Sequence, residues 1–335
     1  MSFELFVEVT RNKTVESRHF GAAVVCDHKG NLLESWGEPE QLVFPRSALK
    51  PMLAIDLIES GACDKFGLSD AELTLACASH QGEPMHQNLV EAWLHRLGLG
   101  DDDLACGSVL PDDIESANHV LASGQHGRRS HHNCSGKHAG FLTNALHLGL
   151  PTADYHLIGH PLQQRALDTL SDLAEIDLRK FPLGIDGCGF PAITMPLAKL
   201  GHAIARFSNP ADLSAERARA IFRLHAAIAQ NPLHAAGHGT IVSALIAATK
   251  GVVLAKTGAE GVLVAALPAQ GLGIALKIAD GNARPRGAAL LAILDHLGIL
   301  SDAEKSQLGE HMAPSVENSL RATVGEIKPA PTWLK

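Results

Sequence analysis

The sequence predicts an α+β fold in which a mixed or antiparallel sheet is built from both ends of the chain and flanked by helices. The first observation is that strand-like runs cluster near the two ends, at residues 4–10, 20–27, 32–36, 251–256, 261–267 and 271–278. The second is that helical patterns dominate between these two groups. The third is the lack of the regular β-α alternation that is typical of a doubly wound sheet. Together these observations favour one sheet covered by a central helical region.

The chain of 335 residues is interpreted as a single enzyme domain, residues 1–335. Its approximate sub-regions are a sheet region, 1–45 plus 213–300, and a mainly helical region, 46–212. A helix start is indicated at Ser69, because an acidic residue stands three positions later. Further helices are expected at residues 85–97, 160–175, 214–229, 239–249 and 286–298. The tail after Pro314 is expected to be irregular.

Composition excludes several classes of function. Hydrophobic residues make up 46% of the chain and charged residues 19%, which is ordinary for a domain with a substantial core. The net charge is −8 and no basic run is present, so nucleic acid is not an expected partner. No apolar run is long enough to cross a membrane and no secretion-signal pattern opens the chain, so we expect a cytoplasmic protein without a membrane partner. The six cysteines form no Cys-x-x-Cys pair and are expected to be thiols.

The stretch from Pro45 to Pro51 is the first candidate for chemistry. Ser47 stands at a predicted helix start and Lys50 follows three residues later, so the two side chains share a helix face. A serine hydroxyl becomes a good nucleophile only when a neighbour takes its proton, and a lysine does so when burial or nearby positive charge favours its neutral form. The alternative is an N-cap serine with a solvated surface lysine.

A second motif lies far downstream. Lys256, Thr257 and Gly258 stand at the end of a predicted strand. Ser-x-x-Lys followed by Lys-Thr-Gly is the pair found in serine β-lactamases and penicillin-binding proteins. The alternative is a simple turn after a strand. The third member of that set, Ser-Asp-Asn, is absent, which argues against β-lactamase activity and leaves the fold open.

Two loops concentrate thiols and polar groups. Residues 133–140 read Asn-Cys-Ser-Gly-Lys-His-Ala-Gly and enter a helix, whose N–H groups could hold an anion or lower the pKa of a thiol. Residues 184–191 read Gly-Ile-Asp-Gly-Cys-Gly-Phe-Pro, where three glycines indicate a tight backbone with exposed neighbours. Ser79 ends an apolar run and begins a third polar loop.

Taken jointly, these motifs resemble those of the bacterial L-asparaginase II family of the Rhizobium etli type. The resemblance covers roughly residues 4–300 and rests on the motifs at 45–51, 78–83, 133–140, 186–191, 256–261 and 277–281. It implies a fold like that of serine β-lactamases and glutaminases. It also implies a homodimeric enzyme that hydrolyses L-asparagine to L-aspartate and ammonia.

The resemblance further implies the roles of particular residues. One Ser-Lys pair is Ser47 with Lys50 and the other is Ser79 with Lys256, the last residue being matched by motif alone. Two neighbouring lysines disfavour each other's charge, so one of them can act as a base. A zinc site is implied at Cys134, Lys137 and Cys188. The alternative for these three residues is a pair of buried thiols and a surface lysine.

Other candidates bind the substrate. Arg46 could clamp the substrate carboxylate, or form a surface ion pair. Asp186 could take the substrate ammonium group, or shape a turn. His80 and His138 flank motif residues and are either supporting or purely structural. As alternatives to an asparaginase, the same scaffold could serve a glutaminase, a β-lactam hydrolase or a non-catalytic zinc or amino-acid binding protein.

Overall fold

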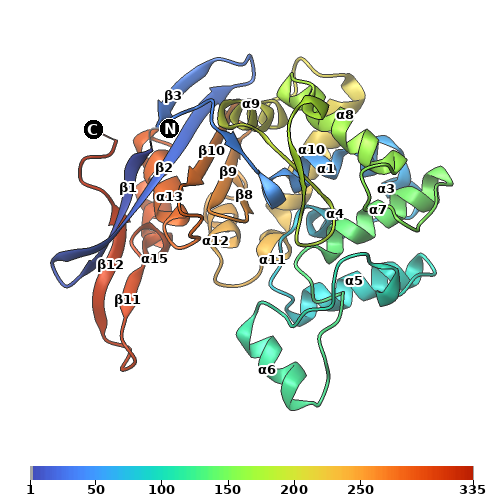
Figure 1. Ribbon diagram of the computed structural model, residues 1–335, viewed down its shortest axis with the longest axis horizontal. Helices are drawn as coiled ribbons and strands as arrows, with labels where there is room; N and C mark the ends of the chain where they lie inside the picture. Colours follow the sequence, from blue (N-terminus) through green and yellow to red (C-terminus); the bar gives the residue numbers. More distant parts are fainter. Residues whose placement is uncertain (1–2, 335) are drawn as a thin grey trace. The chain divides into compact units, whose positions relative to one another are not determined.

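The computed structural model describes residues 3–334, which divide into two compact units (Figure 1). Within the described residues, the first unit, here called the sheet unit, comprises Met1–Ala48, Met195–Asn209 and Ala247–Lys335. The second, the helical unit, comprises Leu49–Thr194 and Pro210–Ile246. The helices between residues 215 and 246 thus belong to the helical unit, whereas the approximate ranges drawn from the sequence put them in the sheet region.

One antiparallel sheet dominates the sheet unit, and its strands come from both ends of the chain. The strand order is β11-β12-β1-β2-β10-β9-β8, with β3 paired to β2 outside this path. The strands are β1 (Glu4–Arg11), β2 (Thr14–Asp27), β3 (Leu32–Trp36), β8 (Leu254–Gly258), β9 (Val262–Leu267), β10 (Leu272–Ile278), β11 (Ser315–Glu317) and β12 (Thr323–Pro329). The predicted α+β fold with a sheet built from both termini is therefore confirmed.

The prediction for the tail after Pro314 was wrong, because β11 and β12 form an antiparallel pair there. β12 also pairs with β1, with Val7 opposite Pro329 and Val9 opposite Ile327. Only Ile327 is buried along β12, so the segment shows no alternating apolar pattern of its own. Its conformation depends on pairing with a strand more than 300 residues away, which a local pattern cannot indicate.

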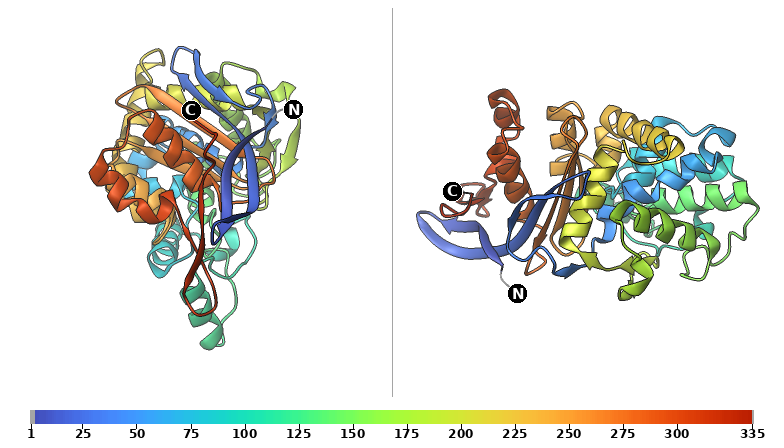
Figure 2. Two further views of the ribbon diagram at one scale, coloured as in Figure 1. Left: turned by 90° about the vertical axis from the view of Figure 1, so that its left-hand side faces the viewer. Right: turned by 90° about the horizontal axis from the view of Figure 1, so that it is seen from above.

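Two helices cover opposite faces of this sheet, α9 (Leu197–Ser208) and α13 (Arg286–His296) (Figure 2). The approach of α9 is close because glycines face each other. A Cβ added at Gly273 of β10 would collide with the backbone of Gly201 and Ala205, and one at Gly201 would meet Val24. The smaller elements of this unit are β4 (Leu42–Val43), β7 (Met195–Pro196), α14 (Asp302–Gln307) and α15 (Gly309–Met312).

Short helices make up most of the helical unit. They are α1 (Lys50–Leu53), α2 (Ile55–Glu59), α3 (Ala62–Lys65), α4 (Asp70–Cys77), α5 (Pro84–Arg96), α6 (Ile114–Ala122), α7 (Ser135–Leu148), α8 (Pro161–Ala174), α10 (Ala215–Gln230), α11 (Pro232–Ala236) and α12 (Ile241–Ala248), the last crossing into the sheet unit. A hairpin of β5 (Leu183–Ile185) and β6 (Pro191–Ile193) completes it.

Local signals fix the centre of the helical unit. Ser69 caps α4 and forms a reciprocal capping box with Glu72, as its spacing predicted. α4 packs on α7, which is buried along its first eleven residues. Gly136 permits this contact, because a Cβ there would clash with the carbonyl group of Leu75. The two loops at the ends of these helices, after Cys77 and before Ser135, are thereby brought together.

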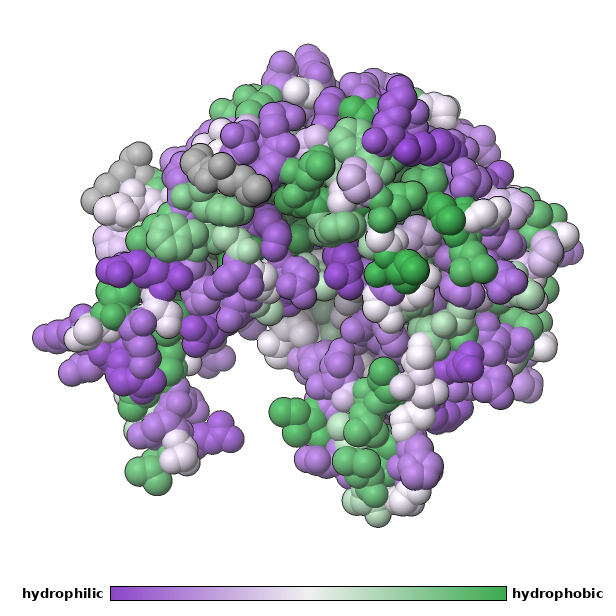
Figure 3. All heavy atoms as spheres, viewed as in Figure 1, coloured by the Kyte–Doolittle hydropathy of each residue, from purple (hydrophilic) through white to green (hydrophobic). Residues whose placement is uncertain are grey.

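The surface differs from this core. The segment around α6 carries apolar side chains on the face shown in Figure 3, where Ile114 is 77% and Leu121 is 56% exposed. None of the helices in the described part of the chain combines the length and apolarity needed to cross a lipid bilayer.

Candidate functional site

The Pro45–Pro51 stretch forms two successive helical turns. A 3₁₀ helix, η1 (Arg46–Leu49), leads without a break into α1, and Pro51 lies in the first turn of α1, where its missing N–H is tolerated. Ser47 lies inside η1, and the residue that precedes α1 is Leu49, so an N-cap serine is not what the structure shows. Arg46 has a left-handed backbone, with φ at 54°.

Lys50 is the buried centre of the site in the helical unit. Its side chain is 1% exposed. The amine nitrogen Nζ lies 2.5 Å from the Ala78 carbonyl oxygen, 3.1 Å from the Asn133 carbonyl oxygen and 3.0 Å from Ser79 Oγ. Two of its three partners are main-chain acceptors at fixed positions. The third is a hydroxyl, which either accepts a proton from an ammonium group or donates one to a neutral amine.

The loop after α4 sets the position of Ser79. α4 ends at Cys77, and Ala78 turns to an extended backbone, so its carbonyl group is free to accept from Lys50. His80 Nδ1 accepts the N–H of Gly82 at 3.0 Å, which leaves Nε2–H to donate to Ser135 Oγ at 2.9 Å. Burial, together with the nearby His86 and Lys50, lowers the pKa of His80 well below its usual value. A neutral His80 therefore ties this loop to the start of α7.

The three predicted metal ligands lie together. Lys137 Nζ is 3.0 Å from Cys188 Sγ and 3.5 Å from the centre of the Phe190 ring. All three ligand side chains are at most 5% exposed. A hydrogen bond with Cys188 lowers the pKa of Cys134 well below its usual value, against the effect of burial. The same hydrogen bond, together with burial, raises the pKa of Cys188. Burial alone would lower the pKa of Lys137, but the two nearby sulfur atoms raise it by a larger amount.

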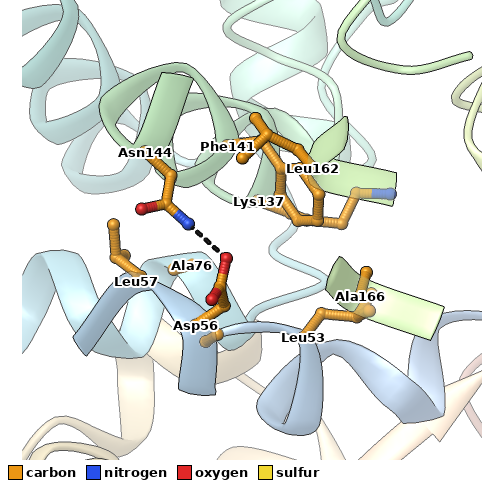
Figure 4. A pocket seen from close by; sticks show the side chains of 11 residues that line it. Leu53, Asp56, Leu57, Ala76, Lys137, Phe141, Asn144, Leu162 and Ala166 are labelled. Carbon is orange, nitrogen blue, oxygen red and sulfur yellow. Dashed lines mark hydrogen bonds between the residues drawn. The ribbon is translucent and has the colours of Figure 1, made fainter. Parts of the chain in front are cut away.

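Two sulfur atoms and an amine nitrogen fit a zinc ion, provided that Lys137 loses its proton. Among the described residues, no group of three His, Cys, Asp or Glu side chains is placed to hold a metal ion, so lysine would have to be the third protein ligand. The carbon stem of Lys137 borders a small cavity of about 20 Å³, while its amine points away from that cavity (Figure 4). Asn144 and Asp56 meet across the cavity in a 2.6 Å hydrogen bond.

Asp186 shapes the loop that carries Cys188. Its N–H donates to the Phe190 carbonyl group at 2.8 Å, its carbonyl group accepts from Gly189 at 2.8 Å, and its carboxylate accepts the Cys188 N–H at 3.4 Å. These contacts form a tight turn at the end of the β5–β6 hairpin. A role for Asp186 in holding the substrate ammonium group stays a prediction, as do substrate contacts of His80 and Arg46.

A second cluster lies within the sheet unit. Lys256 on β8 is 4% exposed, and its amine donates to the Thr257 carbonyl group at 2.8 Å. A Cβ added at Gly258 would clash with the carbonyl oxygen of Pro45, so the end of β8 lies against the chain just before Ser47. Lys256 and Ser79 belong to different units, and their predicted pairing stays a prediction.

Several groups at the site were not anticipated from the sequence. The carbonyl groups of Ala78 and Asn133 carry no side-chain signal at all. Tyr155, whose hydroxyl lies 2.6 Å from His138 Nδ1, could have been noticed as the chain's single tyrosine. Ser135 lies inside the motif at residues 133–140, but its hydrogen bond with His80 is evident only in the folded chain.

Comparison with known families settles the relationship of this chain. The family described as L-asparaginase II matches residues 7–329, nearly the whole chain. The chain belongs to the L-asparaginase II family. Membership of this family supports an amidohydrolase that acts on a small molecule. A search of curated proteins returns no match.

Solved structures are similar to this L-asparaginase II family member at low identity. Mglu in its native form is 15% identical with a TM-score of 0.47, and the match covers 89% of this chain and 66% of Mglu. A β-lactamase from Mycobacterium bovis is also 15% identical with a TM-score of 0.38, and the match covers 87% of this chain and 95% of that protein.

Proposed function

We propose that this protein is an L-asparagine amidohydrolase that releases L-aspartate and ammonia. Family membership supports amide hydrolysis. The observation that carries the proposal is the buried Lys50 amine, held by two main-chain carbonyl groups with Ser79 Oγ 3.0 Å away. Amide hydrolysis by a serine needs a base within hydrogen-bonding reach of a hydroxyl, and this arrangement provides one.

The contacts of Lys50 define how it would act. A neutral amine has two N–H groups and one lone pair. The carbonyl groups of Ala78 and Asn133 take the two N–H groups, which leaves the lone pair directed at the hydroxyl of Ser79. When the amine takes up a proton, its third N–H points to the same oxygen. Lys50 and Ser79 can therefore exchange a proton without a change in the remaining contacts.

The proposal assigns the attack to Ser47, one turn before Lys50 along the continuous helical segment. Ser47 Oγ would bond to the side-chain amide carbon of asparagine, and its proton would pass to Lys50 through the Ser79 hydroxyl, which faces the Lys50 amine. The C–N bond then breaks and the nitrogen takes a proton as it leaves as ammonia, for which Ser79 is the relay. Water next hydrolyses the ester, which releases L-aspartate and restores Ser47. The second pair, Ser79 with Lys256, would assist in proton transfer.

Zinc is part of the proposal, with Cys134, Lys137 and Cys188 as its protein ligands. When bound, the ion would organise the pocket and offer a fourth position to water or substrate. Attack does not require it, because a serine supplies the nucleophile. The homodimer and the cytoplasmic location expected from the sequence likewise stay proposals.

Ammonia release from L-asparagine and L-glutamine, measured beside turnover of a chromogenic β-lactam, tests this function. The proposal expects L-asparagine to be the best substrate. Preferential turnover of glutamine or of the β-lactam would assign the scaffold to one of those enzymes instead. Binding of zinc or an amino acid without turnover of any of the three would indicate a non-catalytic protein.

A further inference from the structure

Arg286 is a half-buried arginine for which the described part of the chain provides no carboxylate partner. Within the described residues, the one hydrogen bond of its side chain runs from Nη1 to the Gly258 carbonyl oxygen, at 3.1 Å. Burial lowers the pKa of this guanidinium group. At least nine other arginines in the described residues form ion pairs with carboxylates, as Arg217 does with Glu59. A guanidinium group has five N–H donors, so most donors of Arg286 remain available.

The guanidinium group of Arg286 lies at the end of strand β8. Gly258, whose carbonyl group binds Arg286, is the last residue of β8 and ends the Lys-Thr-Gly motif. Gly258 also lies directly against the Pro45 carbonyl oxygen, two residues before Ser47. Arg286, β8 and the turn that carries Ser47 all belong to the sheet unit, so these neighbours follow from the structure of that unit alone.

Local electrostatics at Arg286 favour an anion. Removing a guanidinium group from water without a counter-charge is costly, and pairing with a carboxylate recovers part of that cost. Arg286 is also the first residue of α13, where the helix dipole is positive, so the helix offers no compensation. The planar fork of arginine suits the two oxygens of a carboxylate.

We propose that Arg286 binds the α-carboxylate of the amino-acid substrate. The inference rests on the proposed function and deepens it, because it names the group that makes a free amino acid the preferred substrate. Arg286 would hold this carboxylate beside the Ser47 turn, and the side-chain amide would then extend toward the hydroxyl. Arg46, the candidate from the sequence, is a second arginine next to the same serine.

Direct binding tests the inference without requiring turnover. L-Aspartate and L-isoasparagine differ only in the α-carboxylate, which is an amide in the latter. Calorimetry should show that the wild type binds L-aspartate about 10- to 100-fold more tightly than L-isoasparagine, the range expected for hydrogen bonds to a charged group. Arg286→Gln should remove this difference by weakening L-aspartate alone, and Arg286→Lys should retain part of it.

Arg284→Gln is the matched control, because it removes the same charge two residues earlier, before α13 begins, where Arg284 Nη2 lies 3.3 Å from His19 Nε2. It should keep the wild-type preference, and thermal melting should show that each variant is folded. The inference is overturned if folded Arg286→Gln retains the preference, if Arg284→Gln or Arg46→Gln loses it equally, or if the wild type does not distinguish the two ligands. If the wild type does not turn over L-asparagine, the proposed function is rejected. The carboxylate-binding role of Arg286 is then still decided by the comparison of L-aspartate with L-isoasparagine.

Discussion

At the scale of single residues, the proposed chemistry depends on the environment of Lys50. Its buried amine contacts two carbonyl oxygens and one hydroxyl, with no carboxylate among these three partners. A carboxylate would hold the amine in its charged form, whereas carbonyl groups accept hydrogen bonds from either form. These three contacts therefore suit the proton exchange that we propose between Lys50 and Ser79.

Separate substitution of the two serines distinguishes their roles. Ser47→Ala should lower kcat for L-asparagine by roughly three orders of magnitude or more, as loss of a nucleophile does. Ser79→Ala should lower kcat less, because it removes a proton relay. Initial rates of ammonia release, with melting temperatures as the control for folding, decide the matter. If Ser47→Ala keeps near-normal turnover while Ser79→Ala is inactive, Ser79 is the nucleophile.

The thiol pair gives a prediction for the metal. The purified wild type, kept reduced, should contain about one zinc per chain. Cys188→Ser should lower the zinc content and raise KM for L-asparagine more than it lowers kcat, because the ion is proposed to organise the pocket. Cys63→Ser is a matched control, since Cys63 is equally buried but lies on α3. Elemental analysis showing no zinc in the wild type would reject the metal site.

At the scale of elements, the histidines near Ser79 link helices through their neutral forms. His86 Nδ1 accepts the Glu83 N–H at 3.2 Å and Nε2–H donates to the Leu233 carbonyl group at 3.1 Å. Its ring stacks on that of His80 at a centroid distance of 4.8 Å. Two charged imidazoles in this stack would repel each other, and each would lose the acceptor nitrogen that now binds a backbone N–H.

Stability should therefore fall in acid. Burial lowers the pKa of His86 in the folded state below its unfolded value of about 6.5. The resulting stabilisation is fully present above that unfolded pKa and is lost as pH falls through the folded one. Urea unfolding at pH 7.5 and pH 5 should show lower stability at pH 5, and His86→Gln should reduce the pH dependence. An unchanged slope in the variant would contradict a role for this histidine.

The contact between α9 and β10 depends on two glycines. A Cβ at Gly273 would collide with the backbone of α9, and backbone cannot rotate away as a side chain can. Gly273→Ala should therefore lower the free energy of unfolding by about 1–3 kcal/mol, the usual effect of overpacking. Gly309→Ala, where no atom lies within 4 Å of an added Cβ, should have a far smaller effect. Equal unfolding free energies for the two variants would contradict this account of the packing.

The elements also show what a sequence can and cannot reveal. The strands near residues 4–36 and 254–278 were predictable because their strand-forming runs are bounded by turns, and α4 because Ser69 and Glu72 cap it. β12 was missed because its one buried residue gives no pattern, and its partner lies at the other end of the chain. At the site, Lys50 and Ser79 were both recognised, yet their contact depends on how α1 meets the loop after α4.

At the scale of the whole molecule, family membership indicates the class of reaction, and local contacts suggest which residues perform it. The L-asparaginase II match covers residues 7–329 and supports an amidohydrolase. The proposed roles of individual residues rest on contacts such as those of Lys50 and Arg286. The motifs indicated candidate residues, whereas the carbonyl groups that hold Lys50, and the lack of a carboxylate beside Arg286 among the described residues, are evident only in the folded chain.

Ammonia release from L-asparagine by the wild type and by Lys50→Met tests the central claim most directly, because methionine keeps the length of the side chain and removes the amine. We expect steady release by the wild type, faster in alkaline than in acidic buffer, because a lysine base must be neutral to take a proton. Lys50→Met should lose at least about three orders of magnitude of that rate while remaining folded. Near-normal release by folded Lys50→Met, or a wild-type optimum near pH 5, would contradict a lysine base.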